Sequence, residues 1–300
     1  LVMQQEELIN YNTTFPCHGG YFYGGGRKLG CHAHSSPLNL PQSIQNSCNA
    51  YYCFCLREML DNNLAKYKTS SHAYDVWRGH VTSLGFGDKL GVDFPNEKSG
   101  LILKSSRYDK IYGKNHWRSS TIISISIGQG EVLATPIQTA NLAACIANKG
   151  YFYTPHIMKS IEGDSIDIKY RTKHYSTIES KYFDVVHEGM LGAVMAGTAR
   201  IGRIDSLEFC GKTGTAQNPH GKDHSIFIAF APKDNPKIAI AVYVENAGFG
   251  ATWAVPIASL MIEKYLRRSI SPNRLYLEER IMNAKFYGDT TENETESKPD

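Results

Sequence analysis

Two short motifs hold side chains whose types and spacing suit the binding of a carboxylate and an oxyanion. Gly211-Lys212-Thr213-Gly214-Thr215 puts one ammonium and two hydroxyls between glycines at the end of a predicted strand. An ammonium and hydroxyls bind a carboxylate, glycine lets a ligand approach the backbone closely, and an edge-strand N–H can stabilise an oxyanion. Ser47-Cys48-Asn49 adds a hydroxyl and a carboxamide, although a Ser-x-Asn triplet that opens a helix is most often an N-cap. A Lys-Thr-Gly triplet is also common in turns, so neither motif alone defines a site.

A set of cysteine and histidine residues predicts a metal site beside the second motif. Cys31-x-x-His34 has the spacing of a ligand pair, and Cys17 and Cys48 complete a set of three thiols and one imidazole. Three thiolates and one imidazole make a closed tetrahedral zinc site. Cys48 stands inside the Ser47-Cys48-Asn49 motif, so zinc would position that motif and would not be the catalyst.

The same residues allow other interpretations. Seven cysteines is an odd number, so at least one thiol lies outside any internal disulfide. A disulfide between Cys17 and Cys31 is one alternative, and Cys48 as a small buried apolar residue is another. In a third alternative, His18 or His32 replaces His34 as the imidazole ligand. The remaining cysteines lie on apolar faces and are expected in the core: Cys53, Cys55, Cys145 and Cys210.

Hydrophobic periodicity places both motifs on regular elements. From Pro41 onward, apolar residues recur at spacings of three and four, which predicts a helix with Ser47 and Asn49 near its start. Three runs predict the strands of an antiparallel meander: 207–217, 225–232 and 237–245. Further apolar helices are predicted from Thr135-Pro136 to Asn148 and over 253–268, and the last has one broad apolar face that would cover the sheet.

The composition describes a folded chain with no strong electrostatic preference. The 300 residues carry 32 Lys plus Arg against 29 Asp plus Glu, a formal net charge of +3, which argues against nucleic acid or an anionic membrane as the main partner. No apolar run approaches the roughly 18 residues of a membrane span. Glu6 and Glu7 are expected on a solvated helix face. Residues 288–300 contain no apolar side chain, which predicts a disordered tail.

In combination, these motifs resemble a known family. A helical Ser-x-Asn, followed much later by Lys-Thr-Gly on an edge strand beside a C-terminal helix, is similar to the penicillin-binding proteins and serine β-lactamases. The stretch from Leu84 to Gly100 resembles the cell-elongation subgroup of class B transpeptidases, penicillin-binding protein 2. The resemblance runs from about Phe15 to Leu266. Other class B segments are Gly128-Gln129-Gly130, Ala134-Thr135-Pro136 with Gln138, Gly197-Thr198-Ala199 and Phe227–Pro232.

The resemblance implies an α+β fold, in which an antiparallel sheet is covered by helices and a helical subdomain is added. Residues 1–270 would form an incomplete transpeptidase domain with a Cys/His-rich insertion at 17–40. Residues 271–300 would form a C-terminal extension, disordered from about 288. Enzymes of this family acylate the serine of a Ser-x-x-Lys motif. No lysine of this chain has a serine three positions before it, and the expected reason is that the motif lies upstream of Leu1.

The resemblance also implies roles for the residues that are present. Ser47 is the expected proton relay, and Asn49 would hold an amide of the substrate. Lys212 would support Ser47 and attract the terminal carboxylate of a D-alanyl-D-alanine stem peptide. Thr213 and Thr215 would hydrogen-bond that carboxylate, and the Thr215 N–H would be one oxyanion donor. The expected substrate-binding set is Thr213, Gly214 and Thr215.

The implied activity is that of a serine-type D-Ala-D-Ala transpeptidase or carboxypeptidase, which cross-links peptidoglycan in cell elongation and binds β-lactams. This chain by itself would be inactive, and the chemistry requires no cofactor. The parent protein would face the periplasm, with an inner-membrane anchor outside this chain and a glycosyltransferase partner. Two alternatives stay open: a serine β-lactamase, and a noncatalytic zinc-stabilised binding or scaffold module of the same fold.

Overall fold

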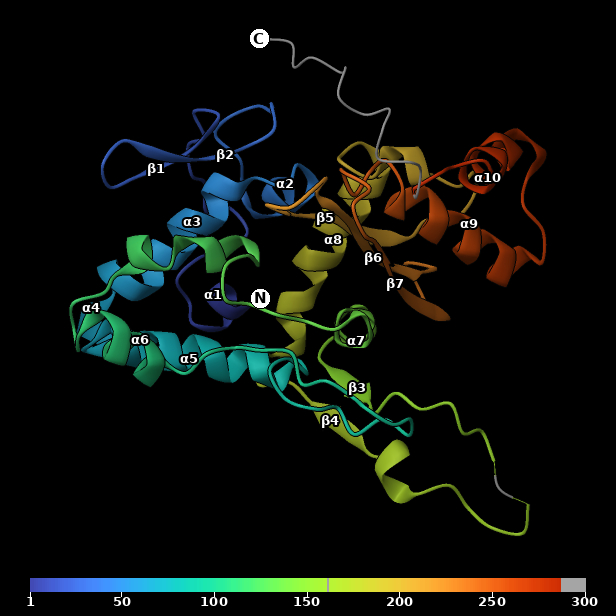
Figure 1. Cartoon of the computed structure of the whole chain (residues 1–300), viewed down its shortest axis with the longest axis horizontal. Helices are drawn as coiled ribbons and strands as arrows, with labels where there is room; N and C mark the ends of the chain where they lie inside the picture. The colour runs from blue at the N-terminus through green and yellow to red at the C-terminus, as the bar shows by residue number, and fades with distance from the viewer. Residues whose placement is uncertain (161, 287–300) are drawn as a thin grey trace.

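The computed structural model describes residues 1–160 and 162–286, which form a helical part and a sheet part side by side (Figure 1). The sheet has three antiparallel strands in the order β5-β6-β7, with bounds Cys210–Ala216, His224–Ala231 and Ile238–Val244. This confirms the predicted meander: β5 and β7 are shorter than their predicted runs, and β6 has the predicted length but begins one residue earlier. The mixed α+β class is confirmed as well.

Helices cover both faces of the sheet. Helix α9 (Ala254–Arg267) lies against one face of β6 and β7, as the apolar face of its sequence predicts. Helices α7 (Pro136–Ala147) and α8 (Phe183–Met195) lie against the other face (Figure 1). Alternation along β6 follows this arrangement, because Phe227 belongs to the apolar cluster under α9, whereas Phe230 belongs to the cluster under α7 and α8. The sheet thus separates two apolar clusters.

The helix predicted from Pro41 is two helices, so that part of the prediction is wrong. Helix α2 (Leu40–Gln45) ends before Ser47, and α3 (Asn49–Arg57) begins after it. Ser47 has a left-handed φ of +53°, and the N–H groups of Ser47 and Cys48 donate to the carbonyls of Ile44 and Ser43. These two bonds form the capping motif that ends many helices, in which the left-handed position is usually glycine. Cys48, and not Ser47, is the N-cap of α3.

Helix α7 begins at Pro136, as predicted from Thr135-Pro136, and a capping box fixes this start. Thr135 accepts a hydrogen bond from the N–H of Gln138, and the Gln138 side chain accepts one from the N–H of Thr135. The buried Gln138 also donates from Nε2 to the carbonyls of Asp88 and Ser99. One glutamine therefore starts the helix and holds both halves of the segment between Leu84 and Gly100.

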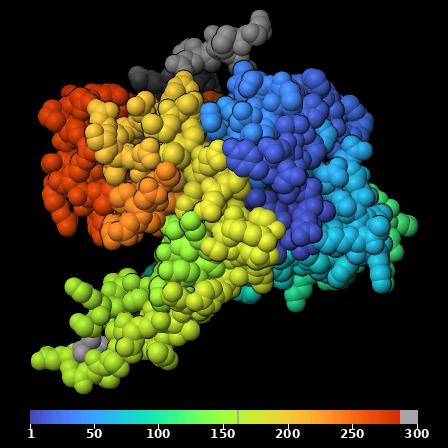
Figure 2. Space-filling view, turned by 180° about the vertical axis from the view of Figure 1, so that it is seen from behind, coloured from blue at the N-terminus to red at the C-terminus, as the bar shows by residue number. Residues whose placement is uncertain are grey.

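The other elements complete the helical part and a projecting hairpin. The hairpin of β3 and β4 extends from the body of the molecule, below the sheet in Figure 1 and at the lower left of Figure 2. Among the described residues, no helix is both long enough and apolar enough to cross a bilayer. The remaining helices and strands are α1 (Val2–Gln5), β1 (Gly20–Tyr23), β2 (Arg27–Gly30), α4 (Leu64–Tyr67), α5 (Ser70–Ser83), α6 (Ser105–Tyr112), β3 (Tyr151–Tyr153), β4 (Lys173–Tyr175) and α10 (Leu275–Met282).

The predicted C-terminal extension begins with ordered structure. Helix α10 contacts α9, and the guanidinium of Arg274 lies 2.8 Å from the carboxylate of Glu263, which is fully buried in α9. Removal of one partner of a buried ion pair destabilises the fold, because the other charge is left buried and unpaired. The pair therefore links α9 to the start of α10. The tail predicted to be disordered from about 288 lies outside the described residues.

Candidate active site

The two motifs meet through Ser47 and Lys212. The Nζ of Lys212 donates to the Oγ of Ser47 over 2.7 Å. Lys212 lies on β5, and Ser47 lies at the left-handed turn between α2 and α3, with its hydroxyl bonded to the strand. A non-glycine residue in this backbone region is strained by about 1 to 3 kcal/mol, and such strain is found most often at functional sites.

The ammonium of Lys212 is held in a desolvated position. Besides Ser47, it donates to the carbonyl oxygen of Thr213 over 2.9 Å. Burial lowers the pKa of Lys212 to about 8, because a charged ammonium loses its hydration there. A lysine with this pKa is mostly charged at neutral pH but can give up its proton at low cost, which suits both carboxylate binding and proton transfer.

Hydrogen bonds from outside the strand orient the two threonines. Thr213 and Thr198 share a hydrogen bond between their hydroxyls at 2.8 Å. The N–H of Gly250, in the loop after β7, donates to the Oγ1 of Thr215 over 3.3 Å. Of the segment Gly197-Thr198-Ala199, Thr198 thus supplies a hydroxyl that orients the Thr213 side chain. The sequence provided no signal for Gly250.

Close packing requires glycine at Gly211 of the motif and at Gly250 in the loop after β7. A Cβ built on Gly211 would lie 2.2 Å from the ring of Phe227 on the adjacent strand β6. A Cβ on Gly250 would lie 2.4 Å from the carbonyl oxygen of Gly214, so the loop after β7 lies directly against the strand. Real Cβ atoms do not approach so closely, hence both positions exclude a side chain unless the structure shifts.

Asn49 lies beside the site but is partly engaged elsewhere. It is the first residue of α3, and its Nδ2 donates to the carbonyl of Gly30 at the end of β2 over 2.7 Å. The expected contact with a substrate amide would therefore use the Oδ1 of Asn49 or would replace this bond. The bond ties the Cys/His-rich insertion to the active-site helix.

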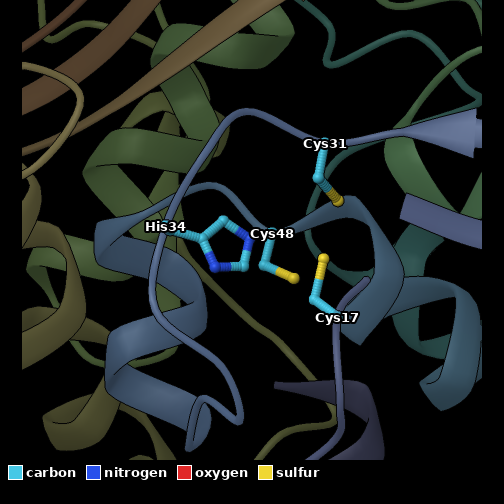
Figure 3. A group of neighbouring side chains, drawn as sticks. All are labelled: Cys17, Cys31, His34 and Cys48. Atoms are coloured by element: carbon cyan, nitrogen blue, oxygen red, sulfur yellow. The ribbon is translucent and has the colours of Figure 1, made fainter. Parts of the chain in front are cut away.

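The four residues predicted as metal ligands converge. The ligand atoms of Cys17, Cys31, His34 and Cys48 all lie within 4.8 Å of one another (Figure 3). They come from the loop before β1, the loop after β2 and the N-cap of α3, so three separate segments meet at one point. His32, one of the alternative ligands, instead lies against the ring of Phe249 with centroids 5.8 Å apart. His18 is not part of the converging group.

The hydrogen bonds around the cluster fit a ligand set. The Nδ1 of His34 donates to the carbonyl of Ser35 over 2.7 Å, which leaves Nε2 as the bare nitrogen, and that buried Nε2 has no partner among the described residues. Backbone N–H groups of Ala50 and Tyr51 donate to the sulfurs of Cys31 and Cys48. A metal-binding histidine usually donates its second ring N–H to a carbonyl or carboxylate. The three thiols are not joined by a disulfide.

The thiols of the cluster influence one another. Hydrogen bonds from the Cys48 thiol, the Ala50 N–H and the Cys17 thiol hold the pKa of Cys31 well below its usual value, despite burial. The neighbouring Cys31 raises the pKa of Cys48 in turn, together with burial. The cluster therefore favours ionisation of Cys31 before Cys48.

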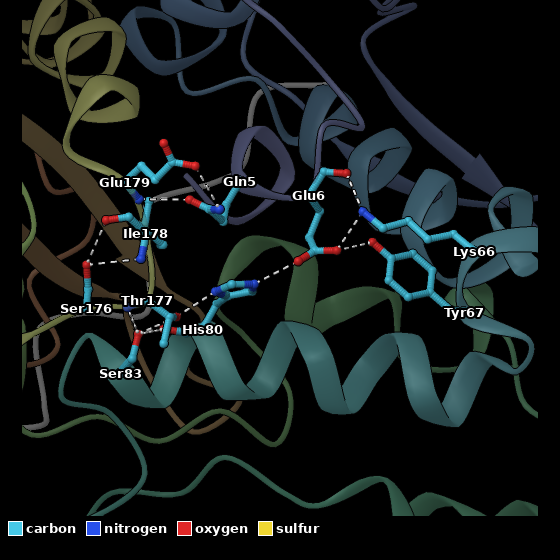
Figure 4. Close-up of polar contacts among 10 residues, drawn as sticks. All are labelled: Gln5, Glu6, Lys66, Tyr67, His80, Ser83, Ser176, Thr177, Ile178 and Glu179. Carbon is cyan, nitrogen blue, oxygen red and sulfur yellow. Dashed lines mark hydrogen bonds and ion pairs between the residues drawn. The ribbon is translucent and has the colours of Figure 1, made fainter.

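Glu6 is not on a solvated face, so that prediction is wrong for Glu6. Glu7 is exposed as predicted, but it lies beyond the end of α1 at Gln5 and not on a helix face. The Glu6 carboxylate meets the Nζ of Lys66 at 2.8 Å, the hydroxyl of Tyr67 at 2.7 Å and the Nε2 of His80 at 2.9 Å (Figure 4). The Nδ1 of His80 continues the network to the hydroxyl of Thr177 at 2.7 Å. The first residues of the chain are thus fastened to α5 and to the segment before α8.

This network shifts the titration of the glutamate. Desolvation opposes ionisation of Glu6, but hydrogen bonds from Lys66, Tyr67 and His80 outweigh it and lower the pKa to about 2. The carboxylate therefore stays ionised through the physiological range.

A three-stranded antiparallel sheet between helices, with a Lys-Thr-Gly edge strand facing a Ser-x-Asn turn, defines the class of serine acyl-transfer enzymes related to penicillin-binding proteins. A family model described as the penicillin binding protein transpeptidase domain matches residues 1–263. The chain belongs to this family.

Curated relatives carry the name of the cell-elongation subgroup. The peptidoglycan D,D-transpeptidase MrdA of Acinetobacter baumannii is 31% identical over 236 residues, which cover 72% of this chain and 33% of the relative. MrdA of Haemophilus influenzae is 34% identical over 211 residues, 63% of this chain and 32% of the relative. The chain therefore spans about a third of the length of these relatives.

Solved structures show the same fold. Penicillin-binding protein 2 of Pseudomonas aeruginosa aligns with a TM-score of 0.76 and 25% identity, covering 91% of this chain and 58% of that chain. Penicillin-binding protein 2 of Helicobacter pylori aligns with a TM-score of 0.73 and 25% identity, over 90% of this chain and 48% of that chain. The expected fold and the expected subgroup are both confirmed.

Proposed function

We propose that this chain is the larger part of a peptidoglycan D,D-transpeptidase domain that acts on stem peptides ending in D-Ala-D-Ala through an acyl-serine intermediate. The observation that carries the proposal is the contact of Lys212 with Ser47, beside two oriented threonines on an edge strand. The nucleophile would come from a Ser-x-x-Lys motif outside this chain. The carbonyl attacked by it would lie against the N–H of Thr215.

In this mechanism the residues of the site bind the substrate carboxylate and transfer a proton to the leaving amine. Lys212 at neutral pH attracts the terminal carboxylate, and the hydroxyls of Thr213 and Thr215 hydrogen-bond it. Attack on the D-Ala-D-Ala carbonyl breaks its bond to the terminal D-Ala, whose nitrogen must gain a proton as it leaves. The Oγ of Ser47, held by Lys212, is placed to deliver that proton. An acceptor amine, or water in a carboxypeptidase, then takes the acyl group.

Family relationships extend the proposal to the whole protein. Residues 1–270 would be the domain and 271–300 an extension, in a protein anchored in the inner membrane that faces the periplasm. A solved complex of penicillin-binding protein 2 with MreC from Helicobacter pylori and a peptidoglycan synthase complex are among the structural matches. By analogy, a glycosyltransferase is the partner we propose. β-Lactams, which mimic the D-Ala-D-Ala end, would acylate the same serine.

The cluster of Cys17, Cys31, His34 and Cys48 fits a structural zinc ion. The buried Nε2 of His34, which has no hydrogen-bond partner within residues 1–160 and 162–286, is the observation that favours zinc over a disulfide and His34 over His18 or His32 as its ligand. Four protein ligands leave no open position, so bound zinc would supply structural stability and no catalytic step. Because Cys48 lies between Ser47 and Asn49, the ion would fix the turn that presents the Ser47 hydroxyl to Lys212.

Covalent labelling tests the proposed function. We expect a labelled penicillin to acylate a protein in which this sequence continues upstream through Ser-x-x-Lys, and to leave the 300-residue chain unlabelled. Replacement of the upstream serine by alanine is the matched control. Absence of labelling in the longer protein would favour the noncatalytic scaffold instead. Rapid hydrolysis of the acyl-enzyme would favour the β-lactamase.

A further inference from the structure

The side-chain carboxamide of Gln129 is hydrogen-bonded to the outer edge of β5. Its Nε2 donates to the carbonyl oxygen of Thr215 over 3.0 Å, and its Oε1 accepts from the N–H of Gln217 over 3.3 Å. β5 is the outermost strand of the sheet and pairs with β6 along its other edge. A carbonyl and an N–H on one exposed strand edge are the groups that bind an added peptide strand. Gln129 therefore occupies a position where such a strand would bind.

The carboxamide can leave this position without rearrangement of the chain. Gln129 is half-buried, between the exposed residues Gly128 and Gly130, which have left-handed φ angles of +72° and +70°. The backbone is held separately, because the N–H of Gln129 donates to the carbonyl of Ser124 over 3.0 Å. Rotation of the Gln129 side chain alone would free the carbonyl of Thr215.

The alternation of an antiparallel ladder places the N–H of Thr215 on the same edge as its carbonyl. In such a ladder, the two residues of a hydrogen-bonded pair exchange both of their hydrogen bonds. A substrate residue whose carbonyl is held by the Thr215 N–H therefore directs its own N–H at the Thr215 carbonyl. That carbonyl is the acceptor that Gln129 already occupies.

We propose that Gln129 is a displaceable gate on the acceptor edge of β5, which a peptide ligand opens by replacing the carboxamide with its own backbone N–H. The proposal rests on the proposed function, since it assumes a D-Ala-D-Ala ligand along β5. The gate would select between ligands that have an N–H at this position and ligands that do not. A ligand with an N–H at this position exchanges one hydrogen bond for another, whereas a ligand without it must leave Gln129 in place or leave the Thr215 carbonyl without a partner.

The test compares two ligands on the 300-residue chain by NMR. The first is N-acetyl-D-alanyl-D-alanine, and the second is the same molecule methylated at the acetylated nitrogen, which removes the relevant N–H. With the first ligand we expect the side-chain amide signals of Gln129 and the N–H signal of Gln217 to shift together with those of Thr213 and Thr215. With the methylated ligand, the Gln129 and Gln217 signals should stay in place.

A variant supplies the second measurement. Gln129→Met keeps the length of the side chain but has no hydrogen bond to β5, so it removes the competitor. We expect it to bind the acetylated dipeptide ~3- to 10-fold more tightly, the range that the loss of one competing hydrogen bond predicts. Its affinity for the methylated analogue should equal that of the unaltered chain. A residue that only stiffens β5 would not produce this dependence on a single N–H.

The outcomes separate the gate from the function on which it rests. Shifts at Thr213 and Thr215 without any at Gln129 would overturn the gate and leave the proposed function standing. An equal loss of affinity for both ligands in Gln129→Met would also overturn it, because Gln129 would then only support the strand. If neither ligand at millimolar concentration shifts any signal of β5, the proposed substrate class itself is wrong, and the gate with it.

Discussion

The ammonium of Lys212 lies 2.7 Å from the hydroxyl oxygen of Ser47, although 165 positions separate the two residues in the chain. Two strained or costly features meet in this contact: a serine with a left-handed backbone and a lysine without its hydration. Each alone would be unfavourable, and proteins retain such pairs where chemistry needs them.

Replacement of Ser47 separates backbone strain from the hydroxyl. Ser47→Gly and Ser47→Ala both remove the partner of Lys212, but only glycine adopts a φ of +53° without strain. We expect the glycine variant to have a free energy of unfolding about 1 kcal/mol above that of the alanine variant. Urea denaturation measures this difference, and equal stabilities would show that the turn is not strained. Neither variant should support acyl transfer in the longer protein.

Ligand binding should depend on the charge of Lys212. Burial lowers the pKa of its ammonium to about 8, so the proton is lost as pH rises through that value, while the carboxylate of the ligand stays ionised. The affinity for acetylated D-alanyl-D-alanine should therefore fall as pH rises through about 8. Calorimetry across this range measures it. Lys212→Met serves as the control, and we expect it to bind weakly with no fall in affinity near pH 8. If this variant showed the same fall, a group other than Lys212 would be responsible for it.

Zinc content should follow the cysteine cluster. Purified chain should contain one zinc ion, and chelation should lower the melting temperature, because the ion stabilises only the folded state. Cys48→Ser should lose the metal, whereas Cys145→Ala, at a buried cysteine outside the cluster, should keep it. Elemental analysis measures the zinc content, and thiol titration measures whether modification of the thiols releases the zinc. Substoichiometric metal together with no zinc release on thiol modification would remove the proposal, and a mass lower by two hydrogens would indicate the disulfide.

Glu6 should stabilise the fold in a pH-dependent manner. Its pKa is lowered to about 2, so its contribution is present above the unfolded pKa of roughly 4.3 and is lost as pH falls toward 2. With allowance for solvent screening, Glu6→Gln should lower the free energy of unfolding at neutral pH by about 1 to 2 kcal/mol. The difference from the unaltered chain should shrink below about pH 4.

The neighbouring glutamate provides the control for this prediction. Glu7 is exposed, so Glu7→Gln should leave the free energy of unfolding within about 0.5 kcal/mol of the unaltered value. Denaturant titrations at several pH values compare the two variants. A pH-independent loss in Glu6→Gln would mean that packing, and not the carboxylate charge, is responsible.

Gly211 should not tolerate a side chain. The Cβ of Gly211→Ala would lie 2.2 Å from the ring of Phe227, and such overpacking typically lowers stability by about 1 to 3 kcal/mol. In Gly214→Ala the nearest side-chain atom, the Cβ of Ile226, is 3.3 Å away, and we expect a smaller effect. Thermal unfolding of both variants gives the comparison. Rescue of Gly211→Ala by Phe227→Leu would identify the ring as the cause.

Much of the sheet and several helix ends could be predicted because their signals are local. Apolar alternation predicted β6 and β7, and Thr135 with Pro136 predicted the start of α7. The break at Ser47 had no such signal, because the left-handed position of this capping motif usually holds glycine. Glu6 was misplaced for a related reason, since its three partners come from residues 66–80.

The sequence by itself determined the fold class, the family and the residue types of the site, because strand periodicity, capping pairs and short motifs are properties of neighbouring residues. It also singled out the four possible zinc ligands. Only the tertiary structure decided that Lys212 holds the Ser47 hydroxyl, that His34 turns a bare nitrogen toward three thiols, and that Gln129 covers the edge of β5. Such contacts depend on how distant segments pack, and side-chain direction at a contact follows from that packing and not from spacing along the chain.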